Sequence, residues 1–325
     1  MVKRALPSND ETATIPVMNA LNSDKIQSLR EHTSWTQLQM YMRCSMQYYF
    51  RYVLGHKERP KLIMSNGSAG HEALELNAKH KIASGEDQPL EQIISNYDQA
   101  LTKELADFEK SDFEPDDSIP AIKDATTQSL TVWRVKEAPL VTPITAELEF
   151  TIPLPETETF QYPTKPVTGK IDRISKRLRT VIPGRPRQAR TEVVDYKFPQ
   201  RLPSNLQELA NMNDQLTTYD LVLTMAKTPT DDLGFEHFVP PTKTIPSRIL
   251  QTYRSPELMT PQARVNKQSR LLYKFRTVSR AITSGIFLPT DNPQICGQCG
   301  FRQMCQSSLV KSDYDALQIR QQGAR

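Results

Sequence analysis

Apolar residues recur at three- and four-residue spacing in several parts of the chain, which is the period of an amphipathic helix. Ser34, a residue type that often caps helices, precedes the first such stretch. Its periodic positions are Trp35, Leu38, Tyr41, Met42, Cys44, Met46, Tyr49, Phe50 and Val53. A second helix is expected to begin near Ser68. More helix, with charged faces, is expected over 89–137, interrupted near Pro115 and Pro120.

The period changes to two after this helical part. Ile144, Ala146, Leu148 and Phe150 alternate with polar residues, which predicts a half-buried strand. Two more strands are expected, followed by a helix, two extended segments and a last helix. In chain order these elements are 167–174, 191–196, 205–225, 235–239, 248–253 and 261–284.

This order of elements predicts an α/β fold in which a mixed central sheet is flanked by helices, with a helical part inserted before the sheet. We expect a single folded domain over 28–310. It divides into a helical part at 34–137, a core at 143–241, and a C-terminal helix with a cysteine-rich end at 260–306. The polar ends, 1–27 and 311–325, are expected to be tails.

The composition predicts a soluble, intracellular protein. The chain has 325 residues, of which 38% are hydrophobic, enough for a core once the polar ends are set aside. No apolar run approaches the roughly 20 residues that cross a bilayer, and the N-terminus lacks the apolar core of a signal peptide. We therefore expect no membrane association and no secretion.

Charge is distributed unevenly, although the net charge is only +4. Between Lys165 and Arg190 there are nine basic residues and one acid, Asp172, whereas the segment 86–117 is acidic. Such a basic stretch suits a polyanionic partner. A solvated loop explains it equally well. The candidate residues for contacting such a partner, which would be DNA if the resemblance described below holds, are Arg185, Arg187 and Arg190.

Three short motifs could form a metal site. They are Gly67-Ser-Ala-Gly-His71, Gly169-Lys-Ile-Asp172 and Val193-Val-Asp195-Tyr-Lys197. Hard divalent cations prefer oxygen ligands, which Asp172 and Asp195 supply. His71 would add an imidazole and so favour Mn²⁺ alongside Mg²⁺. Lys197 lies two residues after Asp195, on the same face of a strand, where an ammonium can hold the attacking water and offset charge on a phosphate. Each motif alone is weak, and their joint order carries the prediction.

Four cysteines form a second candidate site: Cys44, Cys296, Cys299 and Cys305. Without an export signal, thiolates that bind metal are a better explanation than disulfides. Zinc sites more often use paired cysteine knuckles or histidines, and no histidine lies near the C-terminal three.

The three motifs together resemble the RecB-like branch of the PD-(D/E)XK nucleases, which includes the AddB nuclease domain and the CRISPR-adaptation nucleases. Gln215-Leu-Thr-Thr-Tyr219 matches a further motif of that branch. The resemblance implies a restriction-endonuclease-like core. It also implies a metal site formed by His71, Asp172, Asp195 and the carbonyl of Tyr196, with Lys197 beside it. Gln215 would support the lysine or the DNA backbone. Tyr219 would line the same groove, although a core role for it is equally reasonable.

The cysteines are similar to those of the iron-staple members, which use one early cysteine and a late C-x2-C-x5-C to bind a 4Fe–4S cluster. The resemblance therefore implies that Cys44 and the three late cysteines hold such a cluster. Ser45 stands where the family often has proline, and zinc remains the alternative metal. The resemblance extends over about residues 34–306.

The function implied is a Mg²⁺- or Mn²⁺-dependent deoxyribonuclease, expected to act as an exonuclease on single-stranded or end-frayed DNA in repair or recombination. The chain contains no G-x-x-x-x-G-K-[ST] phosphate loop, so unwinding would come from a helicase or another DNA-processing protein. Two alternatives are a non-catalytic DNA-binding scaffold, for which a metal ligand should be missing, and a redox protein whose cluster is the function. No ligand is missing.

Overall fold

The structure is a computed structural model that describes residues 32–58, 61–108, 113, 117–154, 165–179, 187–228 and 230–306. The chain divides into two compact units. Within the described residues, the smaller unit contains 40–56 and 281–306, and the larger unit contains 32–39 and 57–280. The expected tails, 1–27 and 311–325, lie outside the described residues, and the single domain over 28–310 stays a prediction.

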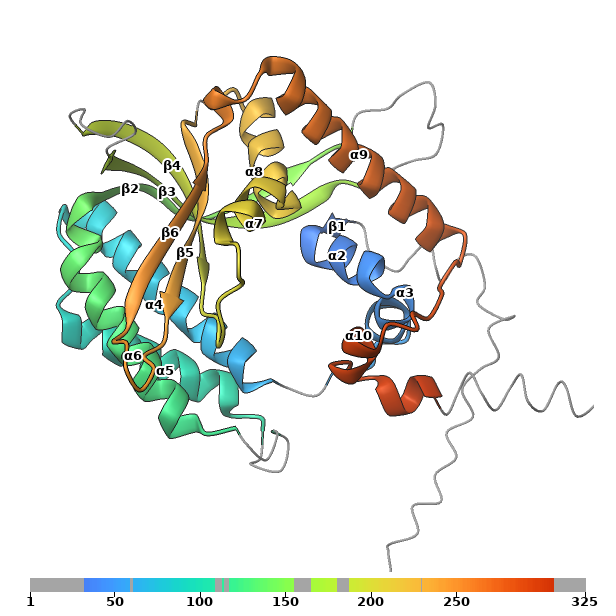
Figure 1. Cartoon of the computed structure of the whole chain (residues 1–325), viewed down its shortest axis with the longest axis horizontal. Helices are drawn as coiled ribbons and strands as arrows, with labels where there is room; N and C mark the ends of the chain where they lie inside the picture. Colours follow the sequence, from blue (N-terminus) through green and yellow to red (C-terminus); the bar gives the residue numbers. More distant parts are fainter. Residues whose placement is uncertain are drawn as a thin grey trace, which may run out of the picture. The chain divides into compact units, whose positions relative to one another are not determined.

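A six-stranded mixed sheet forms the centre of the larger unit (Figure 1). Its order is β1-β3-β4-β5-β6, with β2 also paired to β3. The β1–β3 and β4–β5 pairs are parallel, and the other pairs are antiparallel. The strands are β1 (Thr33–Ser34), β2 (Val141–Ile152), β3 (Val167–Arg179), β4 (Gln188–Lys197), β5 (Asp232–Val239) and β6 (Arg248–Arg254). The α/β class and all five expected strands are confirmed, whereas the two-residue β1 is too short to produce a periodic pattern.

Helices cover both faces of this sheet (Figure 1). One face is covered by α4 (Leu62–Ser84), α5 (Leu90–Leu105) and α6 (Ile119–Lys136), and the other by α7 (Leu206–Met212) and α8 (Asp214–Met225). Successive strand residues point to opposite faces, so Val194 packs against α4–α6 while the preceding Val193 packs against α7 and α8. The last long helix, α9, spans Pro261–Thr283.

Three predicted helices differ from the observed ones. Helix α4 begins at Leu62 rather than near Ser68, because its first turns contain polar residues that are nevertheless buried, such as Asn66. The single helix expected over 205–225 is broken at Asn213, whose backbone is extended and whose side chain caps α8. The first expected helix is divided into α2 (Trp35–Arg43), α3 (Ser45–Tyr48) and η2 (Tyr49–Val53).

Ser34 caps α2 as expected. Its hydroxyl accepts from the backbone N–H of Gln37 at 3.2 Å, and the Gln37 side chain accepts from the backbone N–H of Ser34 at 3.3 Å. This reciprocal pair is a capping box.

Four charged side chains lie inside the sheet face that α4–α6 cover. Arg173 is 1% exposed and bonds to Glu192 at 3.1 Å and to Glu236 at 3.5 Å. Arg177 bonds to Glu236 at 3.4 Å and also to Glu137. The hydrogen-bonding capacity of Glu236 is completed by the indole N–H of Trp133 in α6, at 2.9 Å. A buried ion-pair network therefore ties β3, β4, β5 and α6 together.

This network revises the interpretation of the basic stretch. Arg173 and Arg177 point into the protein, and Lys170 pairs with Glu147 on the neighbouring strand at 2.9 Å. Arg190 is buried and bonds to Asp232 at 2.6 Å. Their partner carboxylates come from other strands, which a count of charges along the sequence does not reveal. Most of these cations therefore do not form an open basic surface.

In the smaller unit, aromatic side chains join an early and a late segment of the chain. Tyr48 and Phe287 stack with ring centroids 6.3 Å apart, and Phe50 contacts Phe301 at 5.7 Å. The hydroxyl of Tyr41 donates to the carbonyl of Ile286 at 2.5 Å. This packing places the beginning of α3 close to the short helix α10 (Pro293–Gly297).

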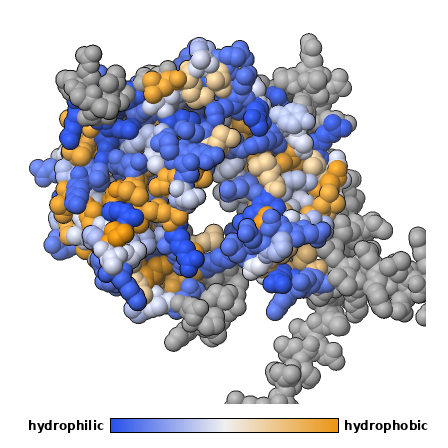
Figure 2. All heavy atoms as spheres, in the orientation of Figure 1, coloured by the Kyte–Doolittle hydropathy of each residue, from blue (hydrophilic) through white to orange (hydrophobic). Residues whose placement is uncertain are grey.

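Hydrophilic residues predominate on the face shown in Figure 2, with apolar residues in patches among them. Among the described helices, none combines the length and apolar character needed to cross a bilayer.

Candidate active site

Two carboxylates meet at the centre of the sheet. Arg173 of β3 pairs with Val194 of β4 in antiparallel register. The preceding Asp172 and the following Asp195 are therefore neighbours. Asp195 is contacted by side chains of α8, and Asp172 by a side chain of α4. Asp195 is 2% exposed. The sheet register thus brings together two residues that lie 23 positions apart in the sequence.

Both oxygens of Asp195 are held by residues that the sequence motifs singled out. Its Oδ1 accepts from the side-chain amide of Gln215 at 2.5 Å and from the hydroxyl of Tyr219 at 2.9 Å. Its Oδ2 lies 2.5 Å from the ammonium of Lys197. That ammonium also donates to Oε1 of Gln215 at 3.3 Å. Gln215, one turn before Tyr219 on α8, therefore bridges the carboxylate and the lysine.

His71 reaches the same place from α4. Its Nδ1 lies 3.1 Å from Oδ2 of Asp172, which also accepts the backbone N–H of Tyr196 at 2.8 Å. The Tyr196 ring points to the opposite face, where its hydroxyl accepts from Arg173. The backbone N–H of Tyr196 contacts Asp172, and the carbonyl of Tyr196 as a metal ligand stays a prediction.

The electrostatics of the site favour a cation. Burial raises the pKa of Asp195, and the neighbouring charge of Asp172 raises it further, so that Lys197 only partly compensates. Burial also acts to raise the pKa of Asp172, but the interactions with His71 and then the backbone N–H of Tyr196 outweigh it, so the pKa is lowered. Burial and Asp195 raise the pKa of Tyr219 well above 10, so this hydroxyl remains a donor. One buried carboxylate is thus left poorly neutralised, which a divalent cation would correct.

The donor set fits a hard divalent ion. His71, Asp172 and Asp195 could hold it. Oδ2 of Asp195 is buried, and the Lys197 ammonium is its contact among the described residues. In the described part of the chain, no three His, Cys, Asp or Glu side chains are arranged around one ion position. At the candidate active site, His71 contacts Asp172 and Lys197 contacts Asp195, so the side chains pair with one another instead of surrounding a common point. Ion binding would replace these internal contacts.

A second histidine, His237 on β5, lies next to the site and was not singled out from the sequence. It stands opposite Lys197 in the parallel β4–β5 register and is 2% exposed. Neither ring nitrogen has a hydrogen-bond partner among the described residues. Burial, and then the charge of Lys197, lower the pKa of His237 to about 4, so the ring is neutral near pH 7. No sequence motif marks this residue, because only the register places it beside Lys197.

Replacing His237 by Phe is expected to flatten the dependence of stability on pH. The pKa of this histidine is lower in the folded state than its usual 6.5, so the unfolded chain takes up the proton first as pH falls. The wild type should therefore lose stability between about pH 6.5 and 4, by no more than about 3 kcal/mol from this group. Urea midpoints at pH 7.5 and 4.5 test this. Parallel losses in both proteins would contradict it.

Gly70 allows α4 to approach the end of β4. A Cβ at this position would lie 2.3 Å from the ring of Phe198, which is stacked on Phe238 with centroids 4.5 Å apart. Gly67, the glycine noted in the sequence motif, has no atom within 4 Å of such a Cβ. The residue next to His71 therefore carries the steric constraint, and Gly67 does not.

The two glycines provide a matched pair of substitutions. Gly70→Ala should lower the free energy of unfolding by about 1–3 kcal/mol through overpacking. Gly67→Ala should raise it by up to about 1 kcal/mol, because alanine is the better helix former. Urea denaturation measures both. An equal gain in stability from both substitutions would show that Phe198 moves aside freely.

The four cysteines gather in the smaller unit. They line one cavity of about 60 Å³ together with Phe50 and Ile295. Burial raises the pKa of Cys305, and the charges of Cys44, Cys299 and Cys296 raise it further. None of the four forms a disulfide in the described residues. The hydroxyl of Ser45 bonds both the N–H and the carbonyl of Leu288, at 2.6 and 3.0 Å, which fixes the segment that carries Cys44.

Of the three candidate DNA-contacting arginines, only Arg187 is both described and exposed. Arg185 lies outside the described residues. The guanidinium of Arg190 is occupied by Asp232, at 2.6 and 3.1 Å, and is therefore not directed at a bound strand.

Comparison with known proteins gives a family match over most of the chain. The family model described as the PD-(D/E)XK nuclease superfamily matches residues 32–306. A crystal structure of an exonuclease candidate from Eubacterium rectale is similar, with a TM-score of 0.48 and 10% sequence identity, over 93% of this chain and 94% of that chain. No curated protein matches the chain.

Proposed function

The chain belongs to the PD-(D/E)XK nuclease superfamily, and from this premise we propose that it is a Mg²⁺- or Mn²⁺-dependent deoxyribonuclease. The observation that carries the proposal is the environment of Asp195. This buried carboxylate lies beside Asp172, and one of its oxygens contacts the ammonium of Lys197, two residues further along the strand. A buried charge of this kind lowers the stability of the fold, and such groups are typical of sites that bind metal or catalyse a reaction.

In the proposed site, His71, Asp172, Asp195 and the carbonyl of Tyr196 would hold the ion. A bound divalent ion supplies a polarised phosphate and a more acidic water. Lys197 would orient that water and offset negative charge that develops on the phosphate.

Two residues of α8 position these groups. Gln215 binds Asp195 through its amide nitrogen and Lys197 through its amide oxygen, so it holds the contacting carboxylate and ammonium in place. Tyr219 donates to Asp195, because its own proton is firmly held.

The proposed substrate is single-stranded or end-frayed DNA, cut as by an exonuclease. We keep Arg187, which is exposed, as a proposed phosphate contact, and we leave out Arg190, whose side chain is engaged by Asp232. A helicase or other DNA-processing protein is the proposed partner, since the sequence contains no phosphate loop of its own.

Labelled DNA tests the proposal. Single- and double-stranded oligonucleotides, labelled at either the 5′ or the 3′ end, are incubated with the protein and Mg²⁺ or Mn²⁺. We expect metal-dependent product ladders that begin at one end of the single strand. No cleavage of any DNA with either ion would contradict the proposal.

We further propose that Cys44, Cys296, Cys299 and Cys305 hold a 4Fe–4S cluster of the iron-staple type. The support is that the four thiols, from segments far apart in the sequence, line one cavity and act on one another's charge. Thiolates at this kind of enclosed, largely apolar position are suited to iron–sulfur ligation.

Anaerobic purification tests the cluster. The protein should be brown, absorb near 400 nm, and contain about four irons per chain. Cys44→Ser should lose the absorbance and lower the melting temperature, whereas Gln303→Ala, at an exposed position between Cys299 and Cys305, should change neither. One zinc per chain and no iron under anaerobic conditions would replace the cluster by the zinc alternative.

A further inference from the structure

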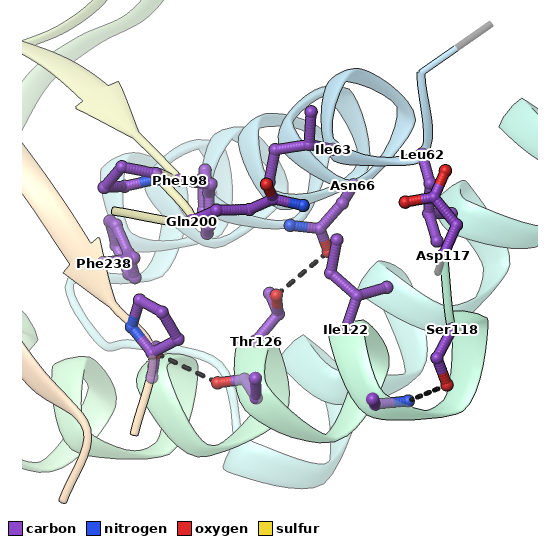
Figure 3. A pocket seen from close by; sticks show the side chains of 15 residues that line it. Leu62, Ile63, Asn66, Asp117, Ser118, Ile122, Thr126, Phe198, Gln200 and Phe238 are labelled. Carbon is purple, nitrogen blue, oxygen red and sulfur yellow. Dashed lines mark hydrogen bonds between the residues drawn. The ribbon is translucent and has the colours of Figure 1, made fainter. Parts of the chain in front are cut away.

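A cavity of about 260 Å³ lies between α4 and α6 in the larger unit (Figure 3). Its walls are formed mainly by apolar side chains of the two helices, closed at one end by the residues that follow β4 and β5. It provides far more room than the ~30 Å³ that one water occupies. Among the residues that line the cavity are Leu62, Asn66, Ile122, Ala125, Phe198 and Phe238.

This cavity shares a wall with the candidate active site. Phe198 directly follows Lys197 in the chain, and its ring lies 5.9 Å from the imidazole of His71 while also lining the cavity. On its other side Phe198 stacks on Phe238. Through Phe198 the cavity therefore borders residues of the candidate active site.

One fixed hydrogen-bond donor points into the cavity. Asn66 is 2% exposed, and its Oδ1 accepts from the hydroxyls of Tyr97 at 2.6 Å and Thr126 at 2.9 Å. These two donors assign the amide orientation, so Nδ2 is left as a donor. Among the described residues, no acceptor is in contact with Nδ2 of Asn66. Figure 3 shows this nitrogen on the side of Gln200, away from Thr126.

The lining selects the class of ligand. Among the described residues that line it, Asp117 is the one that carries a charge, which disfavours a phosphate, and the apolar walls favour a flat neutral ring. Every nucleobase has an apolar face for such walls and an acceptor atom at its edge for the Asn66 amide. A base can enter only when it is unpaired, which fits a single strand or a frayed end.

We propose that this cavity binds one unpaired nucleobase of the substrate strand, next to the phosphate held at the carboxylates. The inference rests on the proposed function, and adds to it a subsite that places the strand. Its stacking and donor contacts strengthen DNA binding at one nucleotide position and do not depend on base identity.

An abasic substrate tests the subsite. A single-stranded oligonucleotide and the same strand with one abasic position are cut by the wild type with Mn²⁺, and the rate at each phosphate is measured. Removing one base should slow cleavage at a single neighbouring phosphate by roughly 10-fold, the range that loss of one stacked base produces. The slowing should appear in KM rather than in kcat.

Filling the cavity should have the same effect as removing the base. Ala125→Leu adds a side chain inside the cavity without removing a hydrogen bond of Asn66, so the variant should cut the intact strand as slowly as the abasic one. Gln128→Leu places the same side chain on the exposed side of α6 and should behave as the wild type. Asn66→Asp keeps the acceptor for Tyr97 and Thr126 and replaces the donor, and should also lose discrimination.

The outcomes separate the two proposals. An active wild type that cuts intact and abasic strands equally at every phosphate would overturn the base subsite and leave the nuclease standing. Full discrimination retained by folded Ala125→Leu, or by Asn66→Asp if the former does not fold, would overturn it as well. No cleavage of either strand by the wild type would refute the proposed function, and the subsite with it.

Discussion

Replacing Lys197 by Ala is expected to lower the single-turnover rate of DNA cleavage by about 100- to 1000-fold, the usual effect of removing one preorganised charge from a reaction site. The ammonium of Lys197 is held by Asp195 at 2.5 Å and by Gln215 at 3.3 Å, so its position is fixed before substrate binds. Single-turnover measurement with excess enzyme separates chemistry from product release. Lys176→Ala removes an equal charge from an exposed position in β3 and should leave the rate unchanged.

Asp195→Asn should lose cleavage to a similar degree while the fold becomes no less stable. The pKa of Asp195 is raised by burial and by Asp172, so its charge destabilises the folded state near pH 7. The amide keeps an acceptor for Gln215 and Tyr219 and removes that charge. An inactive protein with a normal or higher urea midpoint is the expected result, because residues that serve catalysis often cost stability.

Calorimetric titration with Mn²⁺ supplies a readout apart from activity. The wild type should bind the ion, Asp195→Asn should bind it far more weakly, and Lys197→Ala should bind it at least as well. Near-wild-type cleavage by Lys197→Ala, or unchanged Mn²⁺ affinity in Asp195→Asn, would show that the site is assigned wrongly.

Replacing Arg173 by Met is expected to lower the free energy of unfolding by about 3–5 kcal/mol, since it leaves buried carboxylates without their cation. The guanidinium is 1% exposed and bonds to Glu192, Glu236 and the hydroxyl of Tyr196. Methionine fills much of the volume, so the loss reports on charge rather than on a cavity. Urea denaturation at pH 7.5 measures it.

Two comparisons test this explanation. Lys176→Met, three positions further along β3 and exposed, should change stability by no more than about 0.5 kcal/mol. Adding Glu192→Gln to Arg173→Met should recover part of the loss, because it removes one of the stranded charges. If Arg173→Met is as stable as Lys176→Met, the network contributes nothing to the fold.

The α/β architecture could be predicted because both kinds of element leave a local signature. The alternation over Ile144–Phe150 needs only a sheet with one covered face, and the apolar period over 261–284 needs only a helix that packs on one side. Both are observed, as β2 and α9. The predicted helix boundaries were wrong where a polar residue is buried, as at Asn66, and where a single side chain caps a helix, as at Asn213.

The candidate site was also accessible from the sequence, since its members occur in short motifs and in a fixed order. The structure brings together His71, Asp172, Asp195, Lys197, Gln215 and Tyr219. By contrast the basic stretch was misleading. Arg173, Arg177 and Arg190 look like a surface for a polyanion until Glu192, Glu236 and Asp232 are brought against them by strand pairing.

The sequence by itself determined the elements, their order, the family and the residues able to bind metal or take part in catalysis, because each of these shows in short stretches of the chain and in their order. Tertiary structure alone decided which charges are buried, that Gly70 rather than Gly67 carries the close approach, and that His237 stands beside Lys197. It also decided that Asn66 offers a donor to a cavity beside Phe198. These facts depend on strand register and on the approach of helices distant in sequence, for which no local pattern of side chains is selected.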